Sequence, residues 1–160
     1  MKLKSNVIMF LATGFYAGNI PVAPGTFGTI AGLIPCFFLS LQDILPALIY
    51  TVLFILTSIW VAGCAEKILD KQDPGRIVID EVAGIMVTLL GHNFDFATVV
   101  SGFAIFRCLD ILKPFPVSYV EKRLSGGLAV VCDDVAAGIF SNILLTGILW
   151  LTGINRLSIF

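Results

Sequence analysis

Two adjacent pairs of acidic residues stand directly beside apolar stretches, where carboxylates need a partner. The pairs are Asp80-Glu81 and Asp133-Asp134. Neighbouring carboxylates repel each other, and a carboxylate that enters apolar surroundings requires a counter-charge, a metal or water. Hard oxygen ligands of this kind suit Mg²⁺. Helix capping by acids in a first helical turn is the alternative interpretation of both pairs.

A third cluster combines two cations with an acid at helical spacing. Arg107, Asp110 and Lys113 are three residues apart, so one helical face can present a cation, an anion and a cation. Pro114 and Pro116 should end that helix and leave Lys113 near its C-terminus. Arg107 can hold phosphate oxygens through two parallel hydrogen bonds, and Lys113 can add a point charge. The alternative is an interfacial ion pair in which Lys113 reaches toward lipid headgroups.

A turn rich in proline and glycine offers a further anion-binding element. Pro24-Gly25-Thr26 favours a turn, with Thr26 as a candidate N-cap of the apolar helix that follows. Backbone N–H groups and a hydroxyl at a helix start bind anions readily. A plain loop with a cap explains these residues equally well.

Carboxylates for Mg²⁺ together with cations for phosphate oxygens are typical of a phosphoryl-transfer site. The signatures of several other phosphate enzymes are missing, because the sequence has no C-x-x-x-x-x-R, no D-x-D-x-[TV], no G-x-x-x-x-G-K-[ST] and no D-G-x-x-A-R. The single histidine, His92, cannot provide both the nucleophile and the acid of a histidine phosphatase. A metal-dependent phosphatase that activates water survives this elimination.

The elements that must position these residues are very apolar. The chain has 160 residues, enough for one domain, and 58% of them are hydrophobic while 13% are charged. Soluble domains carry about 25% charged residues, and the mean hydropathy here is +0.98. This composition excludes a disordered chain, a nucleic-acid binder built on a basic face, and most ordinary soluble enzymes. It indicates an integral membrane protein.

Five apolar stretches that lack strand-like alternation predict helices. They are 27–41, 44–65, 82–91, 96–109 and 135–153. Only the second and the fifth are convincing membrane-crossing helices by themselves, and the others could be broken, tilted or covered by protein. The sequence therefore predicts an all-α, compact, membrane-embedded bundle of about four to five apolar helices, in a single domain covering 1–160.

The charged residues are distributed unequally about these stretches. If the stretches cross a membrane alternately, nine of the ten Lys and Arg residues fall on the side of the N-terminus, with nine of the eleven acids. An excess of Lys and Arg marks the cytoplasmic side, so the polar face should be cytoplasmic. A small transporter or channel subunit would instead carry ionisable groups through the midplane. A non-catalytic lipid-binding protein, the other alternative, would not need four acids.

Four ordered blocks of the sequence resemble the phosphatidylglycerophosphatase A family. They are Ala23-Pro24-Gly25-Thr26 with Gly28-Thr29; Val78-Ile79-Asp80-Glu81 with Gly84; Phe106-Arg107-x-x-Asp110-x-x-Lys113-Pro114-x-Pro116; and Gly126-Gly127 with Asp133-Asp134 and Ala137-Gly138. The resemblance implies an all-α, Mg²⁺-dependent, multi-pass enzyme of the bacterial inner (cytoplasmic) membrane. It implies removal of the terminal phosphate of phosphatidylglycerophosphate, giving phosphatidylglycerol and phosphate in phospholipid biosynthesis. The stretch 15–19 is bulkier here than the glycine-rich stretch of the family.

These observations and the resemblance together give a hypothesis with a role for each cluster. The expected Mg²⁺ ligands are Asp80, Glu81, Asp133 and Asp134, and with Asp110 they form the expected catalytic set. The expected phosphate-binding residues are Arg107, Lys113, Gly25 and Thr26. Asp110 either orients Arg107 or joins the metal ligands, and water activated by the metal attacks phosphorus in line. The phospholipid substrate stays in the membrane, and stripes of small residues permit self-association without requiring it.

Overall fold

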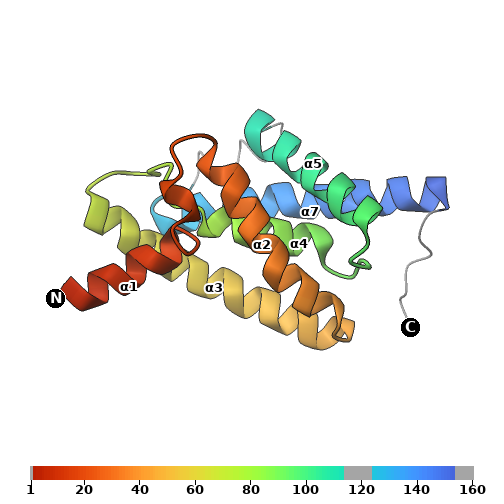
Figure 1. Cartoon of the computed structure of the whole chain (residues 1–160), viewed down its shortest axis with the longest axis horizontal. Coiled ribbons are helices and arrows are strands. Elements are labelled where there is room, and N and C mark those ends of the chain that lie inside the picture. Colours follow the sequence, from red (N-terminus) through yellow and green to blue (C-terminus); the bar gives the residue numbers. More distant parts are fainter. Residues whose placement is uncertain (1, 114–123, 154–160) are drawn as a thin grey trace.

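The computed structural model of the chain describes residues 2–113 and 124–153. Within these residues it consists of six α-helices and one short 3-10 helix, with no strand (Figure 1). They are α1 (Lys2–Ala12), η1 (Ala17–Asn19), α2 (Pro24–Ser40), α3 (Ile44–Leu69), α4 (Ile79–Leu89), α5 (Phe96–Leu112) and α7 (Gly127–Thr152). Each of the five apolar stretches lies in a helix except for at most two residues at its end, so the all-α prediction is confirmed.

The short helix α4 lies at the centre and is surrounded by α2, α3, α5 and α7. Nine of its eleven residues are buried. Close packing on two sides depends on glycine: a Cβ on Gly84 would overlap the ring of Phe106, and a Cβ on Gly138 would meet the carbonyl oxygen of Gly84. Because its neighbours hold α4 so closely, the acids in its first turn have fixed positions.

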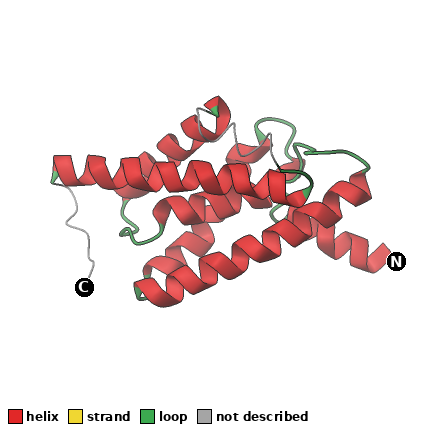
Figure 2. Ribbon diagram, turned by 180° about the vertical axis from the view of Figure 1, so that it is seen from behind, coloured by secondary structure: helices red, strands yellow, loops and turns green. Residues whose placement is uncertain are grey.

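The two longest helices, α3 and α7, have 26 residues each, and the most apolar 18 residues of each have mean hydropathies of 2.2 and 1.8. At 1.5 Å per residue each extends about 39 Å, long enough to cross a bilayer. Only 22% of the most apolar window of α3 is buried, and 44% of that of α7. They meet at Gly127, where a Cβ would overlap the backbone of Ile59 and Gly63. From there they spread apart (Figure 2).

Helix α2 begins earlier than the sequence indicates. Ala23 is its N-cap, with φ 49°, and Pro24 is in its first turn. The prediction of Thr26 as N-cap is therefore wrong, because Thr26 already lies inside the helix. Proline takes the start because its fixed φ suits the first helical position and its missing N–H is not needed there.

Helix α7 also begins before the apolar run that predicted it. Its N-cap is Gly126, with φ 64°, and eight residues of helix precede Val135. Asp133-Asp134 consequently lies inside the helix and not at its mouth. A glycine tolerates this backbone conformation without strain, so the chain can turn sharply there and continue as helix at once.

The bulky stretch before α2 adopts a conformation that is unusual for its residue types. Phe15 and Tyr16 have φ values of 57° and 72°, and their side chains are exposed. The N–H of Tyr16 donates to Oγ1 of Thr13, and both aromatic rings pack against Phe10. Local hydrogen bonds and ring contacts thus hold a turn that glycine would form with less strain.

Candidate active site

Three carboxylates converge where α4 begins. Asp80 and Glu81 come from the first turn of α4, and Asp134 comes from the second turn of α7. One oxygen of each lies within 4.8 Å of the others, and among the described residues this is the one acidic, histidine or cysteine group so arranged. Asp80 and Asp134 are 7% and 4% exposed, so the cluster is largely shielded from water.

Each of the three residues leaves one buried oxygen without a hydrogen-bond partner: Oδ1 of Asp80, Oε2 of Glu81 and Oδ2 of Asp134. Helix capping does not account for the first pair, since the N-cap of α4 is Val78 and no side chain caps it. A buried polar atom without a partner is costly. Three such oxygens at one place fit a divalent cation with oxygen ligands.

Burial also disfavours the charged form of these acids. It raises the pKa of Asp80 well above the ordinary value, and the charges of Glu81 and Asp134 raise it further. Burial likewise raises the pKa of Glu81, although Arg107 acts in the opposite direction. A bound cation would remove this cost, so cation binding and loss of protons are linked.

Arg107 is placed beside the cluster by its neighbour in the sequence. Phe106 is fully buried, with its ring against α4, and this fixes the rotation of α5. Nη1 of Arg107 donates to Oδ2 of Asp110 at 2.5 Å and lies 3.9 Å from Oε1 of Glu81. Asp110 thus contacts Arg107, which fits one of its two expected roles, and it also lies beside Asp134, which keeps the other role open. Nε of Arg107 is buried and has no partner.

Gly25 brings the start of α2 against the same cluster. A Cβ there would overlap the carboxylate of Glu81 and come within 3.0 Å of Nη2 of Arg107. Thr26 follows directly and is half-buried, but its N–H donates to the carbonyl of Ala23. The first turn of α2 thus faces the site through the backbone of Gly25.

Lys113 and Asp133 form a separate ion pair. Lys113 ends α5 with φ 41°, and its Nζ donates to Oδ2 of Asp133 at 2.6 Å. Adjacent residues of a helix point about 100° apart, so Asp133 does not face the group that contains Asp134. The structure brings together three of the four expected metal ligands. Pro114 and Pro116, expected to end α5, lie outside the described residues.

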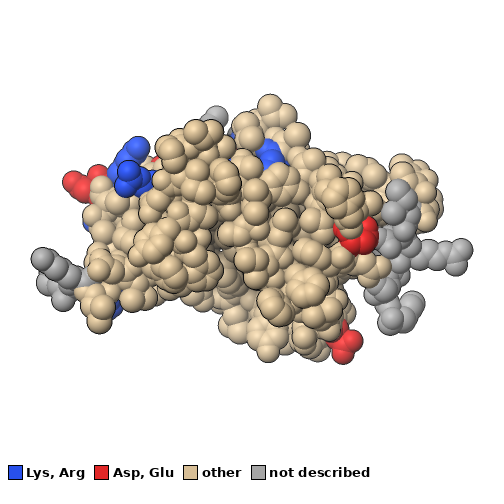
Figure 3. Space-filling view, viewed as in Figure 1, with Lys and Arg blue, Asp and Glu red and all other residues tan. Residues whose placement is uncertain are grey.

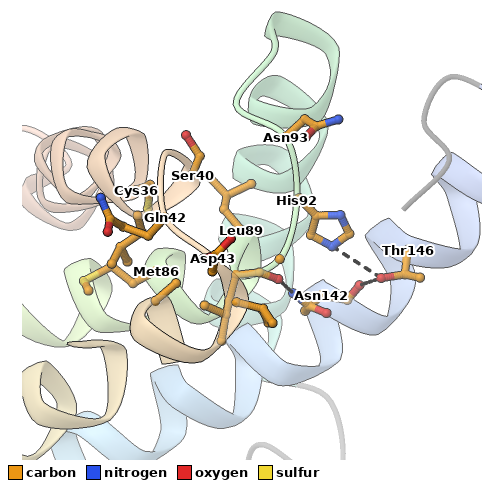
Figure 4. Close-up of a pocket in the computed structure, with 15 residues that line it drawn as sticks. Cys36, Ser40, Gln42, Asp43, Met86, Leu89, His92, Asn93, Asn142 and Thr146 are labelled. Carbon is orange, nitrogen blue, oxygen red and sulfur yellow. Dashed lines mark hydrogen bonds between the residues drawn. The ribbon is translucent and has the colours of Figure 1, made fainter. Parts of the chain in front are cut away.

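The opposite end of α4 contains a cavity of about 440 Å³, bordered also by α2, α3 and α7. Here Asn142 donates hydrogen bonds to three carbonyls that end α4, those of Val87, Thr88 and Leu90. His92 contacts Oγ1 of Thr146 at 3.3 Å (Figure 4). Neither the motifs nor the family resemblance pointed to this region. Polar pairs directly after two apolar runs, Gln42-Asp43 and His92-Asn93, are the signal that would have found it.

Comparisons with known proteins agree with the resemblance seen in the sequence. The family described as phosphatidylglycerophosphatase A matches residues 10–149. Phosphatidylglycerophosphatase A of Haemophilus influenzae is 36% identical over 145 residues, 89% of each chain. The Escherichia coli protein of the same name is 35% identical over 153 residues, covering 93% of this chain and 85% of the relative.

A further relative carries another substrate in its name. A Bacteroides thetaiotaomicron protein, provisionally named a phosphatidylinositol-3-phosphatase, is 37% identical over 163 residues, covering 96% of this chain and all of the relative. No solved structure matches the chain. The extent of the family match and the identities to these relatives show that the chain belongs to the phosphatidylglycerophosphatase A family.

Proposed function

We propose that this protein hydrolyses the terminal phosphate monoester of phosphatidylglycerophosphate and releases phosphatidylglycerol and inorganic phosphate. One observation carries the proposal: three carboxylates, each with a buried and unpartnered oxygen, converge beside Arg107, whose buried Nε also has no partner among the described residues. This arrangement suits a cation and a phosphate at adjacent positions. The names of two relatives support the choice of lipid.

The metal-binding role belongs to Asp80, Glu81 and Asp134, whose unpartnered oxygens fit Mg²⁺. When bound, Mg²⁺ would neutralise phosphate charge and acidify a water for attack on phosphorus. The three side chains come from two helices that glycines hold closely together, so the ligand set is preformed. Asp133 takes a different part in this proposal, since its carboxylate pairs with Lys113.

Phosphate binding belongs first to Arg107. Its Nε has no partner within the described residues, and Asp110 holds the far edge of the guanidinium. The guanidinium can therefore turn a free donor edge to the phosphate without losing its support. Gly25 leaves the space beside Glu81 and Arg107 free of a side chain. Asp133 positions Lys113, which adds positive charge at the rim of the site.

The proposed enzyme spans the bilayer with α3 and α7 and keeps its site on the cytoplasmic face. Both helices expose apolar faces that lipid would cover. On the face seen in Figure 3, basic residues lie to the left and centre, and the right-hand end shows only acidic ones among the described residues. The positive-inside rule assigns the basic end to the cytoplasm. The acyl chains of the substrate can then remain in the bilayer during the reaction.

The testing experiment measures phosphate release by the purified protein in detergent. Phosphatidylglycerophosphate, phosphatidylinositol 3-phosphate and phosphatidic acid are compared, first with Mg²⁺ and then with excess EDTA. We expect release from phosphatidylglycerophosphate that stops with EDTA and returns with Mg²⁺. Release from phosphatidylinositol 3-phosphate alone would overturn the substrate and keep the metal phosphatase. Phosphate release that persists in EDTA would overturn the proposed requirement for a metal ion.

A further inference from the structure

The cavity at the far end of α4 is well formed and lies apart from the carboxylates. Its volume of about 440 Å³ is within the range of sites for small molecules. Apolar side chains from three helices line part of it, namely Cys36, Leu39, Ile44, Ala47, Met86 and Leu89. Polar side chains line the rest, and Figure 4 shows Gln42, Asp43 and His92 among them. Such a lining suits a ligand with one polar and one apolar end.

An apolar groove continues from this cavity between α2 and α3. Its volume is about 520 Å³, and it shares Leu39, Gln42 and Met86 with the cavity. The groove wall on α3 extends from Tyr50 to Thr57, about 10 Å along the helix axis. It therefore leads from the polar cavity toward the middle of the molecule, along the exposed apolar surface of α3.

The charge of the cavity selects the kind of headgroup. Asp43 is the one charged residue among those that line it, and its side chain makes no capping hydrogen bond to α3. Burial lowers the pKa of His92, so the imidazole is neutral near pH 7 and does not offset that charge. Asp43, His92 and Cys36 are not among the residues whose ligand atoms converge for a metal. Asp43 is exposed, and a single carboxylate in a lining that is otherwise uncharged favours an organic cation over a phosphate monoester.

We propose that the cavity binds the headgroup of a phospholipid that ends in a primary ammonium, with one acyl chain in the groove between α2 and α3. The ammonium donates to Asp43, and the amide of Gln42 is available to the phosphodiester oxygens. Neither contact involves the carboxylate site. The inference rests on the membrane-spanning arrangement proposed above, but it does not depend on phosphatase activity.

The direction of the groove agrees with a lipid of the leaflet opposite the active site. Gln42 and Asp43 lie between α2 and α3, at the end of the molecule away from the carboxylates. A headgroup at that end places its chain toward the bilayer midplane, which is the direction in which the groove extends. The length of α4, about 16 Å, separates this cavity from Arg107, so one headgroup cannot occupy both places.

The test measures lipid retention by native mass spectrometry of the detergent-solubilised protein. Phosphatidylethanolamine, phosphatidylcholine and phosphatidylglycerol with identical acyl chains are each added at the same concentration. We expect one phosphatidylethanolamine to be retained at about tenfold higher occupancy than phosphatidylglycerol, with phosphatidylcholine between them because it lacks N–H donors. Equal occupancy of the three lipids would show only non-selective surface lipid and would overturn the proposal.

Asp43→Asn is the deciding variant, because asparagine has nearly the same shape, is well tolerated at an N-cap position and removes only the charge. Its phosphatidylethanolamine occupancy should fall about tenfold, to that of phosphatidylglycerol. Asp70→Asn, an exposed acid at the other end of α3, is the matched control and should retain the lipid. Phosphatase activity should be unchanged in both. Full retention by Asp43→Asn would contradict the headgroup assignment.

A second variant tests the groove. Leu53→Gln places an amide on the exposed groove wall without altering the buried core. It should lower the occupancy of the long-chain lipid and leave binding of glycerophosphoethanolamine, the headgroup without chains, as in the unchanged protein. If occupancy of the long-chain lipid did not fall, the chain would lie elsewhere and the groove would be excluded.

Discussion

The two ends of α4 differ in how the protein treats its buried polar atoms. At the first turn, Asp80, Glu81 and Asp134 leave oxygens without partners in a closely packed setting. At the last turn, the side chain of Asn142 donates hydrogen bonds to three carbonyls, and open space lies beside them. The first turn therefore carries several acidic groups in a crowded space. The last turn borders a cavity whose lining contains one charged residue, Asp43.

This difference separates a site for ions from a site for a bulky ligand. Burying a charged group without a partner costs free energy, so such a group is retained where a bound ligand supplies the partner. Satisfied polar atoms around an open space leave shape and apolar surface to determine what binds. On the two proposals above, the same short helix positions two kinds of site, and changes at one end should leave the other unaffected.

The largest effect should follow loss of one carboxylate of the crowded end. Asp134→Asn should reduce phosphatase activity by more than about 100-fold, because even residues outside the metal's direct ligands change affinity 10–100-fold. Without divalent cations the variant should unfold at a higher temperature than the unchanged protein, since a repelling buried charge is gone.

Asp95→Asn is the matched control for this change. Asp95 caps α5 by accepting from the N–H of Thr98 at 3.0 Å, and asparagine caps equally well. The Asp95→Asn variant should keep its phosphatase activity. Retained activity in Asp134→Asn would remove this residue from the site and with it the contrast between the two ends.

Adding a single methyl group at the first turn of α2 should lower activity almost as much as Asp134→Asn does. Gly25→Ala places a Cβ against Glu81 and Arg107 and should lower activity about 10–100-fold, since small displacements of catalytic groups are costly. Gly147→Ala is the control, because its Cβ meets nothing within 4 Å. Steady-state phosphate release measures both. Equal activities would show that the start of α2 can move aside.

A substitution at the last turn of α4 should lower the stability of the protein and leave its catalytic activity unchanged. Asn142→Leu leaves three carbonyls without this donor and should lower the free energy of unfolding by about 1–3 kcal/mol. Activity per folded molecule should not change. Thermal unfolding and phosphate release on the same preparation separate the two quantities, and a fall in specific activity would mean that the ends of α4 are coupled.

The smallest expected effect is a pH dependence that belongs to one end. Folding raises the pKa of Asp80 and Glu81, so the folded state binds more protons than the unfolded state above about pH 4. Without divalent cations, stability should therefore fall as pH rises from about 4 through the raised pKa values. Mg²⁺ should restore it at neutral pH. Unfolding temperatures in EDTA and in Mg²⁺ test this; a cation-free protein that gains stability over this interval would contradict it.

Much of the architecture could be predicted from the sequence, because uninterrupted apolar runs leave few choices to the chain. The five runs became helices, and the acids of the third run opened their helix as expected. Helix starts were harder to predict. The position of Gly126 at φ 64° and the preference of Pro24 for a first turn moved two starts upstream of the apolar residues.

The site was predictable in its residue types and less so in its pairings. Asp133 and Asp134 are adjacent and chemically identical, yet one faces Lys113 and the other the carboxylate cluster, because a helix turns about 100° per residue. The cavity at the far end depends on side-chain packing among four helices, which no local pattern encodes. The sequence indicates only part of its lining, through the polar residues Asp43 and His92 that follow two apolar runs.

Helices α3 and α7 are in close contact at Gly63 and Gly127, and they diverge from that point. A change in the angle between them would therefore be a rotation about this contact. A bilayer that becomes thinner or thicker changes the tilt of long apolar helices. Rotation about a pivot displaces nearby groups least, and Asp134 is only seven residues from Gly127. Changes in membrane thickness would consequently be absorbed by the far ends of the helices. The proposed metal ligands would keep their geometry, which suits the proposed hydrolysis of a lipid whose substrate and product both belong to a membrane.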